Sequence, residues 1–398
     1  MANEAFGTAY VEIGGQRYDR FLTLSLTRAK QEATCSGTIV LSWPGAEQFN
    51  AQNPPAQALV DGAKGSMYLD GQLAATFRID SRTSNGSPDN FKLDLSFRGL
   101  AGALVDSHAD HESGQENKKK PADICKKLME GYEPKLIDKS NFDRKLERFI
   151  IDEGESVTRA MRRATREFGL TFSENEQGDV VLQKKGTDEG SGQALVLGRN
   201  FVEWAVKRDI SPRASKVKTK GNAVPTDEKY GKDAEEMAGE AIDNYVKYKR
   251  LMRVLIDSDH DKETLKKRAV SEARRRKAQG LNVELTMSTW SDDGGQLWKV
   301  GRMHHVVIPV DQVDDDLQIS QVVFNLTENQ RRARVTLVPK DSFGDEEGGE
   351  DGKDGKGKDS GEAAAGKDSK GAKGGGGGSG DSVFSDSITG AIGEGTPQ

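Results

Sequence analysis

Residues 91–97, FKLDLSF, carry the clearest strand pattern of the chain. Their four large apolar residues alternate with polar ones, which places all four on one face of a half-buried strand. Leu22, Leu24 and Leu26 repeat this period and are expected to share a face, and Asp70-Gly71 is a favoured two-residue hairpin turn. Half-buried strands with tight turns indicate an antiparallel barrel or sandwich. They argue against the parallel sheet of nucleotide-binding proteins.

From about residue 106 the apolar period changes to that of helices. Pro121 is placed to start a helix that ends at Gly131. A second helix is expected over about 155–168, with Gly169 as its stop and arginines on its exposed face. Residues 170–182 then read as a hairpin, which completes a small α+β module.

Residues 195–343 return to strand patterns, with one long helix over about 261–279. The predicted fold class is α+β and β-dominated, with two antiparallel β-barrel-like domains flanking the α+β module and a disordered Gly-rich C-terminal tail. The predicted parts are 1–105 (N-terminal β domain), 106–190 (helix-hairpin module), 191–343 (second β-rich domain), 344–380 (flexible linker) and 381–398 (docking segment). Strands can exchange between the two β domains.

The acidic character of the chain lies in its tail. The 398-residue chain has a net charge of -6, yet residues 1–343 hold 52 acidic and 52 basic residues. A neutral body is not expected to bind nucleic acid or anionic lipid by bulk charge. No stretch approaches the length of a membrane-spanning helix, and the first residues lack the pattern of a secretory signal.

The last 18 residues have a pattern of their own. Apolar residues follow the Gly-rich linker at near-helical spacing, and we mark Val383, Phe384, Ile388 and Ile392 as candidate docking residues. The alternative is a disordered end with stray apolar residues. A 37-residue Gly-rich tether has a root-mean-square reach of about 30–37 Å, which can span to a neighbouring subunit.

Catalytic and cofactor motifs are not found. The sequence contains no G-x-S-x-G, H-E-x-x-H, Walker A or C-x-x-C pattern, so no enzyme activity, catalytic residue or cofactor is predicted. Cys35 and Cys125 are expected to be reduced and partly buried, with a disulfide as the less favoured alternative. His304 and His305 are adjacent, so one is expected in the core and the other in solvent.

Two clusters have a functional alternative. The loop VDSHADH offers a weak candidate metal site, against the favoured interpretation of a polar loop at a domain junction; its possible ligands are Asp106, His108, Asp110 and His111. The basic run of the predicted long helix, from Lys262 to Lys277, is interpreted as a solvated face. The alternative is a helix that lines a DNA channel, although no aromatic residues interleave to stack bases.

Several segments, in order along the chain, resemble the Mu-like phage tail baseplate hub family, the proteins at the centre of contractile-tail baseplates. The matching segments cover most of 1–343: VEIGGQRYDRFLTLSLTRA near the start, FRGLAGALVDS at 97–107, FIIDEGESVTRAMRRATREFGLTFSENEQGDVVLQKKG at 149–186, STWSDDGGQLWKVGRMHHVVIPV, and QVVFNLTENQRRARVTLVPKDSF. The family's VDCSA becomes VDSHADH here, and the Gly-rich tail extends beyond the resemblance.

The resemblance implies a virion structural protein that is made in the host cytoplasm. It implies a homotrimer whose six similar β units adapt the sixfold tail tube to the threefold central spike. Implied partners are the spike, the tube or tube-initiator protein, and further the tape-measure and baseplate wedge proteins, with no membrane and no specific nucleic acid. The alternatives are a tail-associated cell-wall-degrading enzyme, or the hub of a contractile injection or secretion apparatus.

Overall fold

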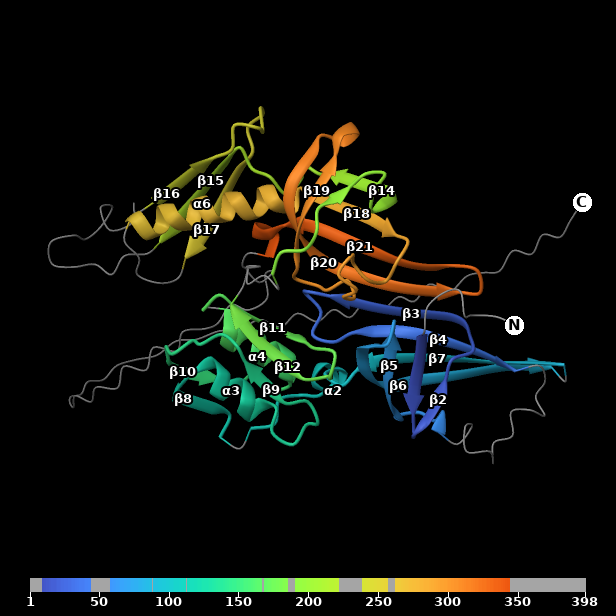
Figure 1. Ribbon diagram of the computed structural model, residues 1–398. Coiled ribbons are helices and arrows are strands. Elements are labelled where there is room, and N and C mark those ends of the chain that lie inside the picture. Colours follow the sequence, from blue (N-terminus) through green and yellow to red (C-terminus); the bar gives the residue numbers. More distant parts are fainter. Residues whose placement is uncertain are drawn as a thin grey trace, which may run out of the picture. The chain divides into compact units, whose positions relative to one another are not determined.

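The computed structural model (Figure 1) describes residues 9–43, 58–87, 89–111, 113–166, 168–184, 190–221, 238–256 and 262–343. Antiparallel sheets dominate this part of the chain, which confirms the predicted β-dominated α+β class. The predicted linker 344–380 and the docking segment 381–398 with its four candidate residues lie outside the described residues.

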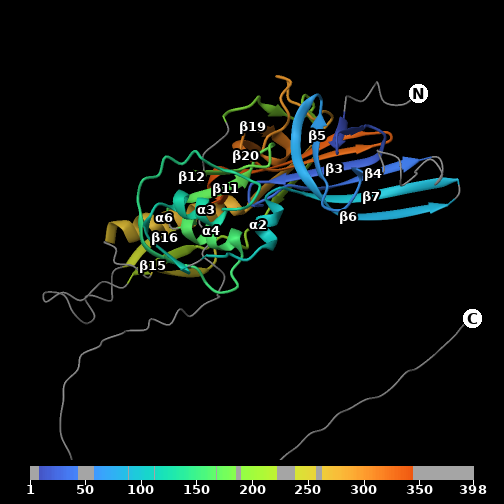
Figure 2. The same ribbon diagram turned by 90° about the horizontal axis from the view of Figure 1, so that it is seen from below.

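Seven strands form the first β region. They are β1 (Ala9–Ile13), β2 (Gln16–Tyr18), β3 (Phe21–Ala29), β4 (Ser36–Trp43), β5 (Lys64–Leu69), β6 (Gln72–Ser87) and β7 (Asn90–Gly99). In the expected strand β7, Leu93, Leu95 and Phe97 are at most 1% exposed. Asp70 and Gly71 both have positive φ, as the predicted hairpin turn requires. Figure 2 shows β3, β4, β7 and β6 as successive neighbours, in the order of their pairing.

Strand β3 departs from simple alternation at its start. A register shift between Phe21 and Thr23 in the pairing with β4 adds one residue to this strand. Phe21, Leu24 and Leu26 therefore face the core, whereas Leu22 is only partly buried. The expectation that Leu22, Leu24 and Leu26 share one face is wrong at Leu22, because the bulge reverses the side of the strand on which it lies.

The second β region continues the same sheet. Its strands are β13 (Leu195–Val196), β14 (Phe201–Arg208), β18 (Leu281–Met287), β19 (Met303–Ile308), β20 (Val313–Thr327) and β21 (Arg331–Pro339), with the short helix η2 (Pro309–Asp311) before β20. Strands β3 and β20 pair in antiparallel register, with Leu24 opposite Leu326 and Leu26 opposite Phe324. The two β regions thus share a 13-stranded sheet and a continuous hydrophobic core. The boundaries at 105 and 190 stay predictions.

A separate core holds the α+β module together. Its elements are α2 (Gly102–Asp106), β8 (Gln115–Lys119), α3 (Pro121–Leu128), β9 (Leu136–Asp138), β10 (Leu146–Ile150), α4 (Val157–Arg166), β11 (Leu170–Glu174) and β12 (Val180–Lys184). Pro121 occupies the first turn of α3, and α4 buries Val157, Ala160, Met161 and Ala164 along one stripe. These features were expected from the sequence.

A third, smaller core lies under the long helix. Helix α6 (Lys262–Gln279) packs on the sheet of β16 (Ala238–Ile242), β15 (Lys216–Gly221) and β17 (Leu251–Ile256). The short helix η3 (Lys340–Phe343), at the end of the described chain, also contacts α6. No helix of the described residues combines the length and the apolar character needed to cross a membrane.

Candidate functional site

The junction between the α+β module and the first β region is organised by one buried carboxylate, that of Glu174 at the end of β11. One carboxylate oxygen accepts hydrogen bonds from the Cys35 amide at 2.9 Å and from the Thr34 hydroxyl at 3.0 Å. The other accepts the Ala101 amide at 2.9 Å. Glu174 is 8% exposed, so these donors replace the water that a free carboxylate would bind.

Gly99, the last residue of β7, makes room for this carboxylate. A Cβ at position 99 would lie 1.9 Å from a carboxylate oxygen of Glu174, so any side chain there would collide with the group. Glycine is therefore required by the close approach of another segment, although its own φ is ordinary. This accounts physically for the glycine in the segment FRGLAGALVDS.

Arg28 of β3 ties three strands together at the same junction. Its guanidinium donates to the Ala74 carbonyl of β6 and to the Glu174 main-chain carbonyl of β11, each at 2.6 Å. On the opposite side, Arg28 pairs with Val322 of β20 in the shared sheet. The Arg28 side chain thus contacts the first β region and the module, and the backbone of the same residue pairs with the second β region.

Both cysteines are free and buried, as expected for reduced thiols. Burial, and after it the charge of Glu174, raises the pKa of the Cys35 thiol to about 12. Burial and the charge of Asp138 raise the pKa of Cys125 to about 12 as well. Thiols with such pKa values are protonated at neutral pH, so they behave as core residues and not as nucleophiles.

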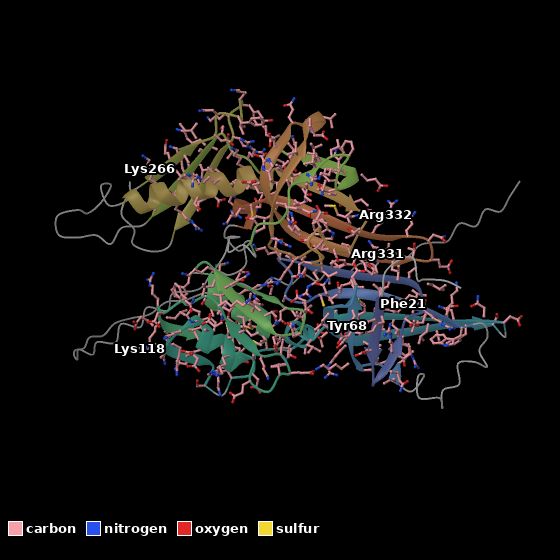
Figure 3. The ribbon with its side chains drawn as sticks, viewed as in Figure 1. Phe21, Tyr68, Lys118, Lys266, Arg331 and Arg332 are labelled. Carbon is pink, nitrogen blue, oxygen red and sulfur yellow. The ribbon has the colours of Figure 1, made fainter. Side chains whose placement is uncertain are left out.

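A second polar contact joins the two β regions at the Asp70 turn. Arg331, at the start of β21 (Figure 3), donates to both carboxylate oxygens of Asp70 at 2.7 and 2.9 Å. Ser291 donates to the same carboxylate at 3.0 Å. The Arg331 guanidinium also lies 4.7 Å from the ring centre of Trp290, which is fully buried. The hairpin turn of one region is therefore fixed to the other.

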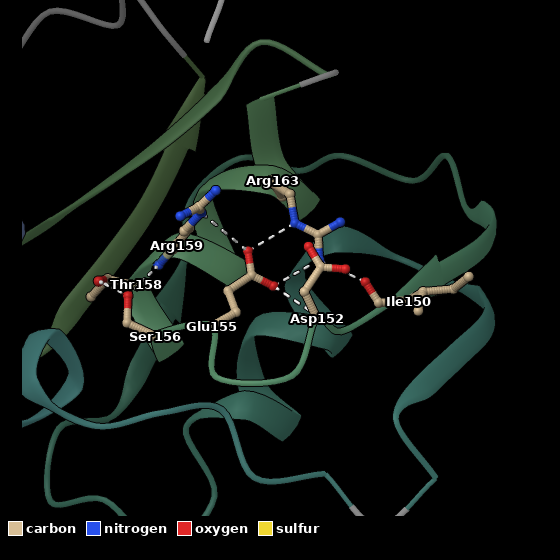
Figure 4. Close-up of polar contacts among 7 residues, drawn as sticks. All are labelled: Ile150, Asp152, Glu155, Ser156, Thr158, Arg159 and Arg163. Carbon is tan, nitrogen blue, oxygen red and sulfur yellow. Dashed lines mark hydrogen bonds and ion pairs between the residues drawn. The ribbon is translucent and has the colours of Figure 1, made fainter. Parts of the chain in front are cut away.

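The sequence GES at 154–156 starts helix α4 (Figure 4). Gly154 has φ of 76°, which favours glycine, and the Ser156 hydroxyl accepts the Arg159 amide at 3.3 Å as an N-cap. Between them, the Glu155 side chain is 2% exposed and accepts two hydrogen bonds from Arg163, at 2.8 and 2.7 Å. Arg163 also donates to the Ile150 carbonyl at 2.6 Å. The motif fixes a helix start and a preceding turn.

The VDSHADH loop is anchored to that helix start. His108 forms a β-bridge with Ser156, and the Ala109 amide donates to the Glu155 carbonyl at 2.7 Å. The His111 ring lies 3.0 Å from a carboxylate oxygen of Glu116, a residue that was not among the predicted metal ligands.

The acidic members of the loop do not join the histidines. Asp106 is bound by Arg98 at 3.0 and 2.6 Å, and these hydrogen bonds lower the pKa of Asp106. The Asp110 side chain takes part in none of these contacts. In the described part of the chain, no three His, Cys, Asp or Glu side chains are grouped to hold a metal ion.

The adjacent histidines lie on opposite faces of β19, as expected from strand geometry. His304 is 1% exposed, and its pKa is lowered, chiefly by burial. The His305 ring nitrogens lie 2.9 Å from the carboxylates of Asp316 and Asp314, and the hydrogen bond that His305 donates to Asp316 is the main cause of its raised pKa. The two side chains cannot act on one substrate atom.

Helix α6 is less uniformly solvated than its sequence indicates. Lys266 (Figure 3) and Arg274 are exposed, but Arg275 is 8% exposed and donates to buried Glu272 at 2.9 and 2.7 Å. Arg276 binds the same carboxylate at 2.6 Å. One acidic residue thus neutralises part of the basic run.

Glu155, Glu174 and Glu272 share one chemical property: each is a buried carboxylate that accepts several hydrogen bonds. The donors to Glu272 lie in its own helix, whereas those to Glu174 come from distant segments, which are thereby fixed relative to one another. Sequence reasoning missed Glu174, because its donors are 73 to 140 residues away. A signal that could have pointed to this contact is the glycine at position 99, where a side chain would collide with Glu174.

Comparison with known proteins gives matches in two segments and over most of the chain. Residues 101–184 match the model of the second domain of the gp44-like baseplate hub protein, and residues 262–346 match the fourth domain of the Mu phage baseplate assembly protein GpP. The baseplate hub protein gp44 of Escherichia phage Mu is 26% identical over 356 residues, which cover 84% of this chain and 89% of that protein. In these segments and over most of its length the chain is similar to the Mu-like baseplate hub proteins. The predicted resemblance and the role of a structural baseplate hub protein are confirmed.

Two solved structures share the fold of this baseplate hub protein. The 43 kDa tail protein of prophage MuSo2 from Shewanella oneidensis has a TM-score of 0.73 at 19% identity, over 84% of this chain and 99% of that one. The tail protein from Neisseria meningitidis MC58 has a TM-score of 0.69 at 19% identity, over 85% and 99%. Glu174, its donor Ala101 and the GES turn lie in the segment 101–184 that matches the model of the second domain, whereas Thr34, Cys35 and Gly99 lie before it.

Proposed function

We propose that three copies of this chain form a hub that joins the sixfold tail tube to the threefold central spike in the baseplate of a contractile phage tail. The observation that carries the proposal is the similarity to the phage Mu hub over 84% of the chain. In this proposal the protein resides in the tail of the virion. The tube-initiator, tape-measure and wedge proteins are its further neighbours.

The internal architecture supports a protein that transmits force. The shared sheet makes the two β regions one continuous body, and the Glu174, Arg28 and Asp70 contacts hold the module and the hairpin turn against it. An obligate trimer needs about 2,000 Å² or more of buried surface per pair of copies. We place the β regions 1–100 and 281–343 in the ring, with the α+β module outside it.

The oligomeric state tests this proposal directly. Light scattering on the purified full chain, alone and with the spike protein of the same phage, is expected to give three times 43.3 kDa, about 130 kDa, for the chain component. Electron microscopy of the complex should show a threefold ring above the spike. A chain that stays monomeric at micromolar concentration with both spike and tube proteins present would overturn the proposal.

The proposed role is non-enzymatic. Buried Glu155, Glu174 and Glu272 all accept hydrogen bonds from other residues of the chain, which supports structural roles for these carboxylates. A zymogram on cell-wall material is expected to show no clearing. Clearing that is lost with a Glu155→Gln variant would instead favour the cell-wall-degrading alternative.

A further inference from the structure

The three-stranded sheet of β16, β15 and β17 has one face covered by helix α6. Val217, Thr219 and Val254 point to this face and are at most 2% exposed. The Thr219 hydroxyl donates to the Leu265 carbonyl of α6 at 2.8 Å. A Cβ at Gly239 would lie 2.3 Å from the backbone of Leu265, so helix and sheet are in direct contact.

The other face of this sheet carries exposed apolar residues. Because side chains alternate along strands, Ile242, Lys216 and Leu251, which lie opposite one another in register, point away from α6. Ile242 is 65% exposed and Leu251 is 42% exposed. The β16–β17 connection adds Tyr245 and Tyr248, at 64% and 53%.

We call the apolar residues Ile242, Leu251, Tyr245 and Tyr248, together with Ile210, whose carbonyl accepts a hydrogen bond from Arg250 at 3.1 Å, the open face. They are five of the ten large hydrophobic residues that are exposed in the described part of the chain, although they come from only 42 positions. Single exposed apolar residues are ordinary, but a cluster of this kind marks an interaction surface.

Positive charge surrounds the open face. Lys247, Lys249, Arg250 and Arg253 follow one another within seven residues, and Lys247 and Lys249 are exposed and form no ion pair with a described residue. The nearby Glu240 is already shared by two lysines of β15, at 2.9 and 2.7 Å. A partner of this surface must therefore offer both apolar side chains and carboxylates.

Residues 381–398 of this chain have that chemistry. The segment DSVFSDSITGAIGEGTPQ contains three carboxylates and no Lys or Arg. Its apolar residues include Val383, Phe384, Ile388 and Ile392. A nucleic acid fits less well, because aliphatic Ile242 and Leu251 cannot stack bases and Arg213 already covers one face of the Tyr245 ring at 4.2 Å.

The described chain ends against helix α6. Helix η3, which ends at Phe343, contacts α6, and α6 in turn covers the opposite face of the sheet. The end of the described chain thus contacts the helix that covers the other face of the sheet, so the open face is left available to a segment of another copy. A tether of 37 residues with a reach of about 30–37 Å allows this.

We propose that residues 381–398 of one copy bind the open face of a neighbouring copy. The inference rests on the proposed trimer, in which three tethered segments and three open faces would exchange contacts. Tethering raises the effective concentration of the segment to the millimolar range, so modest intrinsic affinity is enough for occupancy.

Photo-crosslinking in the full chain tests the proposal. Phe384 is replaced by benzoylphenylalanine, unlabelled and ¹⁵N-labelled copies are mixed before assembly, and the irradiated crosslinks are mapped by mass spectrometry. We expect crosslinks that join light to heavy chains and end within residues 241–253. Crosslinks confined to one copy, or ending elsewhere, would overturn the inference.

A charge-reversal pair provides the matched control. Lys247→Glu with Lys249→Glu is expected to reduce these crosslinks about tenfold, and adding Asp381→Lys with Asp386→Lys should restore them. The same reversal at exposed Lys266 and Lys277 on α6 should leave them unchanged. An equal loss of crosslinks on charge reversal of either lysine pair would contradict docking at the open face.

Light scattering on the same samples separates the two proposals. A trimer without crosslinks in 241–253 refutes the docking but leaves the hub assembly intact. A chain that remains monomeric overturns both.

Discussion

Replacing Glu174 by glutamine tests whether one carboxylate holds the α+β module against the first β region. The carboxylate accepts two backbone amides and one hydroxyl, from Cys35, Ala101 and Thr34. Glutamine has nearly the same shape, but one of its two polar ends is a donor. In either orientation the NH₂ group faces an amide N–H that then has no acceptor.

The expected cost follows from these bonds. One buried N–H without an acceptor costs about 1–3 kcal/mol, and the remaining bonds lose the added strength of an ionised acceptor. We therefore expect Glu174→Gln to lower the free energy of local opening at this junction by about 2–4 kcal/mol. Amide exchange at Cys35 and Ala101 should accelerate by roughly 30- to 1000-fold, since about 1.4 kcal/mol corresponds to a factor of ten.

Hydrogen–deuterium exchange resolved by peptide is the appropriate measurement, because it reports on each segment separately. The matched control is Glu176→Gln, two residues further on. The Glu176 side chain is 29% exposed and lies 4.0 Å from Arg28, so its loss should change stability by less than about 1 kcal/mol. Two results would refute the assigned role of the Glu174 carboxylate: equal changes of amide exchange in the Glu174→Gln and Glu176→Gln variants, or no change at Cys35 and Ala101 in Glu174→Gln.

Three further results are expected. Gly99→Ala should lower the free energy of unfolding, measured by urea denaturation, by about 1–3 kcal/mol. The double variant with Glu174→Ala should lose less stability than the sum of the two single variants, and strict additivity would contradict the steric contact. Asp70→Asn should lower the free energy of unfolding by about 1–2 kcal/mol, because the turn tolerates asparagine at positive φ while the ion pair is lost; an unchanged melting temperature would show that the pair is not stabilising. In an NMR titration, His305 should have its midpoint above about pH 6.5 and His304 below it, and identical midpoints would contradict both shifts. The contribution of His305 to folding stability is therefore present below its unfolded pKa and is lost as pH rises through its folded pKa. Protonation of buried His304 instead weakens the fold on acidification.

Local patterns predicted the secondary structure where one physical rule dominates. The alternation in β7, the proline in the first turn of α3 and the apolar stripe of α4 all depend on neighbouring residues alone. Leu22 was placed on the wrong face because a bulge depends on the partner strand, which the sequence of β3 does not contain. The pairing of the two β regions was foreseen only as possible strand exchange.

The candidate site depended on contacts between distant residues and was largely missed. Nothing near Glu174 distinguishes it from the other acidic residues of its hairpin, since its donors come from positions 34, 35 and 101. Conversely, the VDSHADH loop stood out by composition, but its backbone is bound to the start of α4 and Asp106 is engaged by Arg98. Composition identifies chemical groups, whereas their partners are set by the fold.

The pairing of β3 with β20 has a consequence for synthesis on the ribosome. Ser25 and Asn325, which hydrogen-bond across this pair, are 300 residues apart. At about 5–20 residues per second, roughly 15–60 s pass between the emergence of the two strands. During that interval β3 is an unpaired strand edge on a nascent chain, open to the same edge of a neighbouring nascent chain. Crowded translation late in an infection would therefore favour aggregation at this strand, and chaperones that cover it would raise the yield of folded protein.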